Sequence, residues 1–214
     1  MRILLVSATP QETAPVAAAL RRFTSHQLDL LVTGVGMVAT AARTARALAG
    51  ARYDLALNLG VCGSFDPALA PGTVVHVVSD RLAELGAEDD EAFLTVQHLQ
   101  LLGDDEPPFT GGRLVNAAPP AGVVLAGLPA VDGITVNTVH GNARSIAAIT
   151  ARFHPQVESM EGAAFMYACL VHGLPFAQVR AVSNVVERRN RANWKMAEAI
   201  DELNLTAMSL LDHL

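Results

Sequence analysis

The chain has 214 residues, enough for one α/β domain that buries roughly 70% of its unfolded surface. Hydrophobic residues make up 51% and charged residues 17%, which excludes a disordered chain. The net charge of −6 opposes binding to nucleic acid, because that binding depends on basic patches. No apolar stretch reaches the roughly 20 residues of a membrane span, so we expect a soluble protein with no membrane partner.

The start of the chain and the two cysteines indicate the cytoplasm. Residues 1–6 could begin a signal peptide, but polar residues follow from Pro10 onward before any adequate apolar region. Cys62 and Cys169 lack the paired spacing of zinc or redox sites, so we expect two reduced thiols. The histidines form no close pair of metal ligands, and we expect neither a metal nor another cofactor.

Apolar runs of strand length alternate with helical patterns along the chain. The predicted strands are residues 3–6, 28–32, 55–59, 73–78, 134–136 and 176–182. The predicted helices are residues 12–23, 38–48, 145–153, 161–171 and 192–211. This alternation predicts an α/β fold in which helices flank a mixed, mostly parallel, twisted central sheet.

The segment 81–120 interrupts the alternation with acidic runs, Pro107-Pro108 and Gly111-Gly112. It is either a solvated excursion or, as a sharper hypothesis, a lid over an active site. No linker divides the chain, so residues 1–214 are predicted to form a single domain.

Candidate ligand-binding residues follow the predicted strands, because open α/β sheets bind ligands beyond the carboxyl ends of their strands. Glu12 lies at the start of the first predicted helix, where an acidic residue can also simply complement the helix dipole. Gly34 and Gly36 open the second helix and let backbone N–H groups approach a ligand. No acidic residue completes a dinucleotide fingerprint there. Residues 58–64 form another close-approach loop, and either loop could be a packing turn.

Two carboxylates, Glu158 and Glu161, lie three residues apart at the start of a predicted helix. They share one face if that turn is already helical. The alternative is a capping arrangement with Ser159 as the cap.

The last predicted strand ends in Ser183 and Asn184, a polar pair after an apolar run. An asparagine there could merely form an Asx turn. The loop at residues 140–142 is the least specific feature, and His140 is a candidate for the wall of a pocket.

Taken in order, these segments resemble the nucleoside phosphorylase and nucleosidase family, especially its methylthioadenosine/S-adenosylhomocysteine nucleosidase branch. The resemblance covers the whole chain and rests on residues 1–12, 33–36, 58–63, 160–161 and 179–184. It implies a nucleoside phosphorylase-like fold, a small-molecule nucleoside substrate, cleavage of its N-ribosidic bond, and a homo-oligomer that is at least a dimer.

The resemblance also implies roles by position. Glu12 is implied to activate water, and Glu161 to accept hydrogen bonds from the ribose hydroxyls, with Met160 against the sugar. Ser183 and Asn184 would face the base. The other implied substrate-binding residues are Gly36, Val61, Cys62, Gly63 and His140. These roles suit an oxocarbenium-like transition state, which benefits from a base on the water, acceptors on the sugar and donors on the departing purine.

Asn184 departs from the nucleosidase branch, which usually has Asp at this position. A protonated Asp matches adenine, whereas the Asn184 amide can turn its NH₂ group toward N7 and O6 of a 6-oxopurine. With residues 185–191 and Trp194, Asn184 resembles the branch that cleaves futalosine to hypoxanthine and dehypoxanthinyl futalosine on an alternative route to menaquinone. The carboxyphenyl tail of that substrate needs an apolar slot and a cation, and the sequence does not single out the arginine.

Three alternatives stay open at this point. A phosphorylase of this family needs arginines near the first helix to hold phosphate, but residues 7–12 contain none and Arg43 lies within the second helix, which favours hydrolysis. A methylthioadenosine/S-adenosylhomocysteine nucleosidase would release adenine. A non-enzymatic binding module would bind hypoxanthine without turning over any purine nucleoside.

Overall fold

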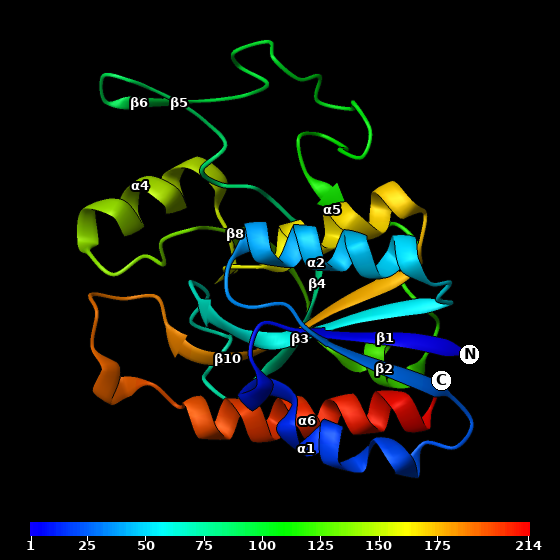
Figure 1. The fold of residues 1–214 in the computed structure, drawn as a ribbon. Helices are drawn as coiled ribbons and strands as arrows, with labels where there is room; N and C mark the ends of the chain where they lie inside the picture. Colours follow the sequence, from blue (N-terminus) through cyan, green and yellow to red (C-terminus); the bar gives the residue numbers. More distant parts are fainter.

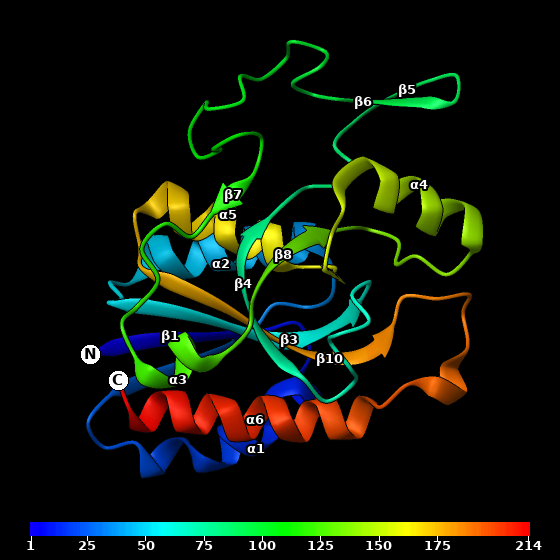
Figure 2. The same ribbon diagram turned by 180° about the vertical axis from the view of Figure 1, so that it is seen from behind.

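A central sheet lies between two layers of helices in the computed structural model, which describes all of residues 1–214 (Figure 1). The strands are β1 (Arg2–Ser7), β2 (Gln27–Val32), β3 (Leu55–Ser64), β4 (Val74–Asp80), β5 (Gly86–Asp89), β6 (Ala92–Thr95), β7 (Leu114–Val115), β8 (Ala130–Thr135), β9 (Val157–Ser159) and β10 (Phe176–Val185). The helices are α1 (Pro10–Ala19), α2 (Met37–Gly50), α3 (Val123–Gly127), α4 (Ala143–Phe153), α5 (Gly162–His172) and α6 (Met196–Asp212), with 3-10 turns at Leu20–Arg22 and Arg191–Asn193. Helices α2 and α5 lie on one side of the sheet and α1 and α6 on the other (Figures 1 and 2).

The main sheet is mixed and mostly parallel, which confirms the predicted architecture. Strand β1 pairs in parallel with β2 and β3, β3 with β10, and β8 with both β4 and β9. Strand β4 pairs antiparallel with β7 and β10, and β9 antiparallel with β3. Strands β3, β10, β4, β8 and β9 therefore form a closed ring, which the sequence did not predict.

Closure of the ring explains why the predicted loop at residues 58–64 is a strand instead. Strand β3 continues to Ser64 because Gly63 and Ser64 pair with β9 on one side and with β10 on the other. The residues of this segment that face the ligand site are thus held by sheet hydrogen bonds rather than by a free loop.

The core has two main parts, one on each face of the sheet. In β1, Ile3 and Leu5 pack in the cluster that includes α6, whereas Leu4 and Val6 pack in the cluster that includes α5. Successive side chains of a strand point to opposite faces, so a strand covered on both faces needs a continuous apolar run. This is the physical reason why the apolar runs predicted the strands.

All five predicted helices are present, with one notable shift. The last helix begins at Met196 rather than at residue 192, because residues 191–193 form a separate 3-10 turn. The Asn190 side chain accepts a hydrogen bond from the Ala192 N–H and so begins that turn. Strands β5, β6, β7 and β9 and helix α3 were not predicted, and each has at most five residues.

The segment 81–120 extends away from the sheet, at the top of Figures 1 and 2. It contains the antiparallel hairpin β5–β6 and returns to the sheet at β7, which pairs with β4. At its base, the Arg81 guanidinium donates hydrogen bonds to the carbonyl oxygens of Gly111 and Gly112. No helix of the structure has the length and apolar character that a membrane crossing requires.

Candidate active site

A cavity of about 400 Å³ lies at the carboxyl ends of β1, β3, β9 and β10, where the sequence placed the ligand site. This volume falls within the range of roughly 300–1,000 Å³ that small-molecule sites occupy. Eight of the ten predicted site residues line it: Glu12, Val61, Cys62, Gly63, Met160, Glu161, Ser183 and Asn184. The topology therefore brings together residues from four distant parts of the chain.

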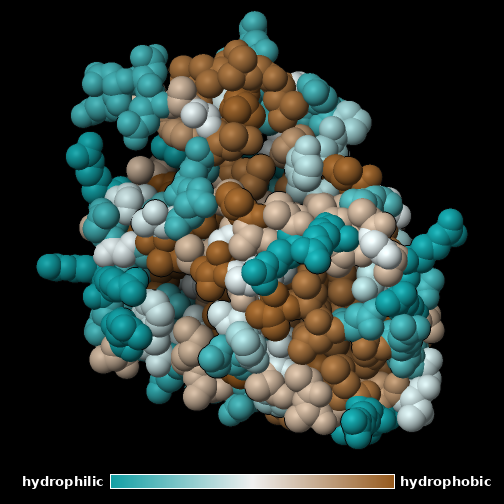
Figure 3. Space-filling view, viewed as in Figure 1, coloured by the Kyte–Doolittle hydropathy of each residue, from teal (hydrophilic) through white to brown (hydrophobic).

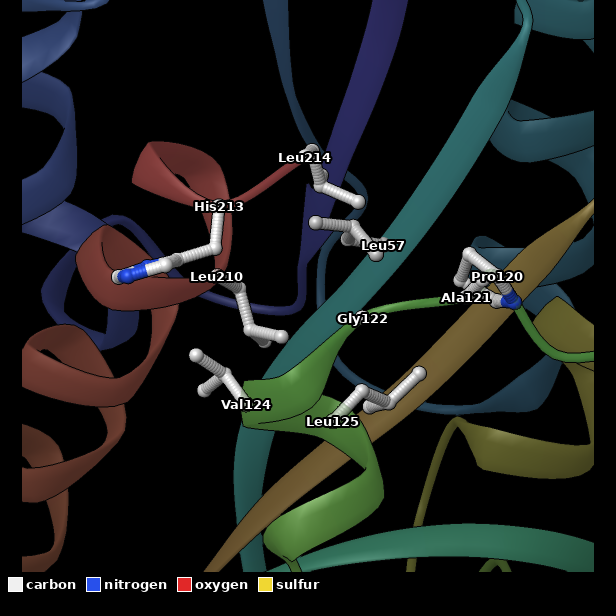
Figure 4. A pocket seen from close by; sticks show the side chains of 9 residues that line it. All are labelled: Leu57, Pro120, Ala121, Gly122, Val124, Leu125, Leu210, His213 and Leu214. Carbon is white, nitrogen blue, oxygen red and sulfur yellow. The ribbon is translucent and has the colours of Figure 1, made fainter.

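A second apolar hollow, shown in Figure 4, cannot hold a nucleoside. It lies between Leu57 of β3, the start of α3 and the end of α6, near Leu210 and Leu214. Its volume of about 10 Å³ is close to the space that one water molecule occupies.

The carboxylate of Glu12 is held by donors from two elements. Its Oε2 accepts hydrogen bonds from the Thr9 N–H (2.8 Å) and the Thr9 hydroxyl (2.9 Å), at the start of α1. Its Oε1 accepts a third from the Val61 N–H of β3 (3.3 Å). The side chain is buried yet borders the cavity, so these bonds fix a carboxylate that can still face a ligand.

Glu161, the residue before α5, is held from two other sides. Its Oε1 accepts a hydrogen bond from the Gly36 N–H (3.1 Å), and its Oε2 lies 3.5 Å from Arg180 Nη1. Gly36 has a φ of +96°, a left-handed conformation that favours glycine. Gly36 does not line the cavity, so it holds the Glu161 carboxylate rather than facing the ligand directly as predicted, whereas the neighbouring Val35 borders the cavity.

Arg180, which the sequence reasoning did not select, is a buried cation behind this wall. Its side chain is 1% exposed. Its guanidinium also donates hydrogen bonds to the side-chain oxygens of Gln178 and Asn58. A Cβ atom at Gly60 would overlap Arg180 Nη1 and lie 3.1 Å from Glu12 Oε1, so the absence of a side chain there makes room for the guanidinium beside β3.

Asp80 continues this polar chain into the interior. Gln178 Nε2 donates to Asp80 Oδ2 (3.0 Å), which turns the amide oxygen of Gln178 toward Arg180. The Asp80 Oδ1 atom accepts from the Thr135 hydroxyl (3.0 Å) and the Arg81 N–H (2.8 Å). Burial raises the pKa of Asp80 to about 6, although hydrogen bonds from Gln178 and Thr135 act in the opposite direction.

A sequence feature could have revealed this chain of residues. Gln178 and Arg180 alternate with Ala177, Val179 and Ala181 in β10, and those three residues belong to the apolar core. Charged residues are almost never fully buried unless they are paired. An arginine in the middle of an otherwise apolar strand therefore indicates a buried partner.

Ser183 and Asn184 form the polar end of β10. The Ser183 hydroxyl lies within hydrogen-bonding distance of the Cys62 carbonyl oxygen (3.1 Å) and of Asn184 Oδ1 (2.8 Å). Asn184 Nδ2 donates one N–H to the Val185 carbonyl oxygen (2.9 Å). The amide thus has one N–H left for the cavity, rather than the two that the sequence reasoning assumed. Burial raises the pKa of the Cys62 thiol to about 12, so Cys62 is a neutral part of the wall.

Glu158 and Glu161 do not share a helical face, so that interpretation of their spacing was wrong. Glu158 belongs to β9, where it pairs with Gly63 of β3 and Ile134 of β8, and α5 begins only after Glu161. Ser159 is not the N-cap residue of α5 either, since Glu161 occupies that position, although the Ser159 hydroxyl accepts a hydrogen bond from the Gly162 N–H of the first turn (3.2 Å).

His140 lies behind the wall rather than in it. Its backbone N–H donates to Glu158 Oε1 (3.0 Å), and its Nδ1 lies 2.6 Å from Glu158 Oε2. Glu158 borders the cavity and His140 does not. Sequence reasoning also missed cavity residues from three segments: Val35, Val139, and the group of Arg189, Trp194, Met196 and Ile200.

Comparison with known proteins places the chain in a family. The family description "Phosphorylase superfamily" matches residues 2–213, and the chain belongs to that superfamily. It is 35% identical to a futalosine hydrolase of Streptomyces coelicolor, over 95% of this chain and 92% of that protein. It is 26% identical to a 5'-methylthioadenosine/S-adenosylhomocysteine nucleosidase of Geobacillus thermodenitrificans, over 90% of this chain and 84% of that protein.

Solved structures share the fold. The MTA/SAH nucleosidase of Streptococcus pneumoniae in complex with 8-aminoadenine superimposes with a TM-score of 0.82, covering 100% of both chains at 19% sequence identity. The nucleoside phosphorylase-like fold that the motifs implied is therefore confirmed.

Proposed function

We propose that this protein is a nucleosidase that hydrolyses the N-ribosidic bond of a 6-oxopurine nucleoside, namely futalosine, to hypoxanthine and dehypoxanthinyl futalosine. The observation that carries the proposal is the meeting of Glu12, Glu161 and Asn184 in one cavity of nucleoside size. The 35% identity to a futalosine hydrolase over nearly the whole chain supports the choice of substrate. This reaction would place the enzyme on an alternative route to menaquinone.

Glu12 serves as the base in this mechanism. Its carboxylate accepts a proton from a water molecule as the water oxygen bonds to C1′ of the ribose. The electron pair of the breaking C1′–N9 bond moves to the purine, and positive charge builds on the sugar. The three hydrogen bonds to Glu12 reduce the motion that would otherwise displace the base from the water.

Glu161 stabilises the sugar in the same step. Ribose hydroxyls donate to its carboxylate more strongly as positive charge develops on the ring. Arg180 is a positioning residue, because its guanidinium lies beside Glu161 Oε2 but does not border the cavity. Met160, the residue before Glu161, packs against the sugar.

Asn184 supports the departing base. The amide N–H that is not bonded to Val185 is free to donate to N7 or O6 of hypoxanthine. An amide cannot transfer a proton as a general acid, so Asn184 stabilises charge on the base only through this hydrogen bond. Ser183 holds the amide oxygen and thereby fixes which side of Asn184 faces the purine.

Hydrolysis is favoured over phosphorolysis by the charges around Glu12. No arginine occurs in residues 7–12, and Arg43 is directed to the Val32 carbonyl oxygen (3.1 Å) outside the cavity. Three glutamates, Glu12, Glu158 and Glu161, line the cavity and would repel phosphate.

We further propose a single-domain cytoplasmic enzyme that acts as at least a homodimer and has no nucleic-acid partner. Exposed apolar side chains support self-association, since Val35 and Val38 beside the cavity are 57% and 78% exposed. Figure 3 shows a further apolar area at the top of the molecule, over the segment between β6 and β7 that includes Leu101. The lid role of residues 81–120 stays a prediction, because none of these residues lines the cavity.

The proposal is tested by incubating the protein with futalosine, inosine and methylthioadenosine in turn and identifying the products by mass. We expect hypoxanthine and a free sugar from futalosine at the highest rate. Adenine from methylthioadenosine as the main activity would establish the alternative nucleosidase, to which the 26% identical relative corresponds. Binding of hypoxanthine without turnover of any nucleoside would indicate a binding module.

A further inference from the structure

We infer that Arg189 binds a carboxylate on the 5′ substituent of the substrate, and that Trp194 with the first turns of α6 holds the aromatic ring that carries this carboxylate. The inference rests on the proposed function and deepens it, because it assigns the part of the cavity that recognises the tail of the nucleoside.

The segment between β10 and α6 has a fixed path, although it extends beyond the end of the sheet (Figure 1, orange). The Val186 N–H donates to the Ser64 carbonyl oxygen (2.7 Å), the Arg189 N–H to that of Gly141 (2.9 Å) and the Lys195 N–H to that of Ser183 (2.8 Å). Backbone hydrogen bonds on both sides of Arg189 and at its own N–H therefore fix the position of its backbone.

Charge distinguishes Arg189 from every other side chain of the cavity. It is the one cationic group among the lining residues, which also include three glutamates. No carboxylate lies within 4 Å of its guanidinium, since the salt bridges of the molecule involve other residues. Among the lining side chains, Glu12, Glu158 and Glu161 would repel an anionic group on a ligand and Arg189 alone would attract it. The Arg191 guanidinium carbon also lies 5.9 Å from the Trp194 ring centroid, but Arg191 does not line the cavity.

Apolar surface adjoins this cation. The Arg189 guanidinium carbon lies 5.2 Å from the centroid of the Trp194 ring, which also borders the cavity. Met196 and Ile200 continue the apolar wall along α6. Trp194, Met196 and Ile200 thus form an apolar slot in which a planar ring can pack. A carboxylate on that ring can bind the Arg189 guanidinium, whose paired N–H groups match the two carboxylate oxygens.

The slot formed by Trp194, Met196 and Ile200 is adjacent both to Glu12, the proposed base, and to Ser183, whose carbonyl oxygen accepts a hydrogen bond from the Lys195 N–H (2.8 Å). Asn204, one turn after Ile200, donates from Nδ2 to the Glu12 carbonyl oxygen (2.9 Å) and accepts from the Val16 N–H (3.1 Å). These bonds join α6 to α1, so the start of α6 is adjacent to the proposed base. A group attached to the ribose at its 5′ end can reach the slot, whereas the purine faces Ser183 and Asn184.

The test compares hypoxanthine release from futalosine and from its methyl ester, in which the tail is neutral. We expect the wild-type enzyme to prefer the acid. Arg189→Gln should lose roughly 10- to 100-fold in kcat/KM on futalosine, the scale of a hydrogen bond to a charged group, and change far less on the ester. Arg189→Lys should recover part of the loss, because it restores the charge without the fork.

Arg188→Gln is the matched control, because Arg188 carries the same charge on the adjacent residue and is exposed like Arg189, but does not line the cavity. It should keep the preference for the acid. If Arg189→Gln leaves the ratio of kcat/KM for the acid to kcat/KM for the ester unchanged, the inference is overturned while the proposed function stays intact. A wild-type enzyme that releases no hypoxanthine from futalosine would overturn the proposed function itself.

Discussion

Replacing Glu161 with Gln should damage both catalysis and stability, for separable reasons. The Gln side chain can still accept a hydrogen bond from Gly36, but its NH₂ group would face Arg180 Nη1, which is 3.5 Å from the carboxylate oxygen it replaces. Breaking a buried ion pair costs about 3–5 kcal/mol because the remaining charge is buried without a counter-ion.

The expected stability loss lies below that range. The 3.5 Å separation is longer than a charge-assisted hydrogen bond, and Arg180 keeps its bonds to Gln178 and Asn58. We therefore expect a loss of about 2–3 kcal/mol in the free energy of unfolding. This corresponds to a fall in Tm of roughly 4–12 °C for a chain of this size.

The catalytic loss comes from the ribose side of Glu161. A neutral amide replaces a carboxylate whose hydrogen bonds strengthen in the transition state, which is worth about 1.5–3 kcal/mol. This predicts a roughly 10- to 150-fold fall in kcat/KM, with most of it in kcat. Steady-state kinetics on futalosine, below the melting temperature of the variant, measure the effect.

A double variant separates the two effects. In Glu161→Gln combined with Arg180→Met, the uncompensated cation is gone, so part of the stability should return while the activity does not. A Glu161→Gln enzyme that shows only a higher KM would contradict a role for Glu161 in the transition state. A variant with unchanged Tm would contradict the pairing with Arg180.

Three further predictions follow from the same site. Glu12→Gln should lose at least about 100-fold in kcat, and wild-type turnover by the folded variant would remove Glu12 from the mechanism. Asn184→Asp should lower kcat/KM for futalosine relative to kcat/KM for its 6-amino analogue. An ionised Asp offers no donor to N7 and O6 of the oxopurine, whereas a protonated Asp suits adenine. An unchanged ratio of the two values would contradict base recognition by Asn184. Because burial raises the pKa of Asp80 to about 6, its stabilising contribution should be complete at low pH and be lost as pH rises through that value. Relative to Asp80→Asn, the wild-type free energy of unfolding should therefore fall between about pH 4 and pH 7, and parallel curves for the two proteins would contradict the buried carboxyl.

The sequence predicted the parts of the fold that depend on local patterns. Runs such as residues 3–6 in β1 are apolar because both faces of the strand are covered, and this pattern is visible without a structure. The closed ring was not predicted, because the pairing of β3 with β10 and β9 joins segments about a hundred residues apart, and no local pattern encodes it.

The site shows the same division. Glu12, Glu161 and Asn184 follow strands or begin helices, so topology alone brought them together. Gly36 and His140 were predicted to line the cavity, but Gly36 contacts Glu161 and His140 contacts Glu158. The spacing of residues in a sequence cannot distinguish a contact with a ligand from a contact with a neighbouring side chain. Arg189 was not singled out among the arginines because only the path of the segment before α6 decides which one faces the cavity.

The central claim is tested most directly by measuring the initial rate of hypoxanthine release from futalosine over a range of phosphate concentrations, with the sugar product identified by mass. The account predicts a rate that does not depend on phosphate and one equivalent of dehypoxanthinyl futalosine for each hypoxanthine. A rate that rises with phosphate, together with a sugar 1-phosphate as product, would contradict hydrolysis by a water molecule activated at Glu12.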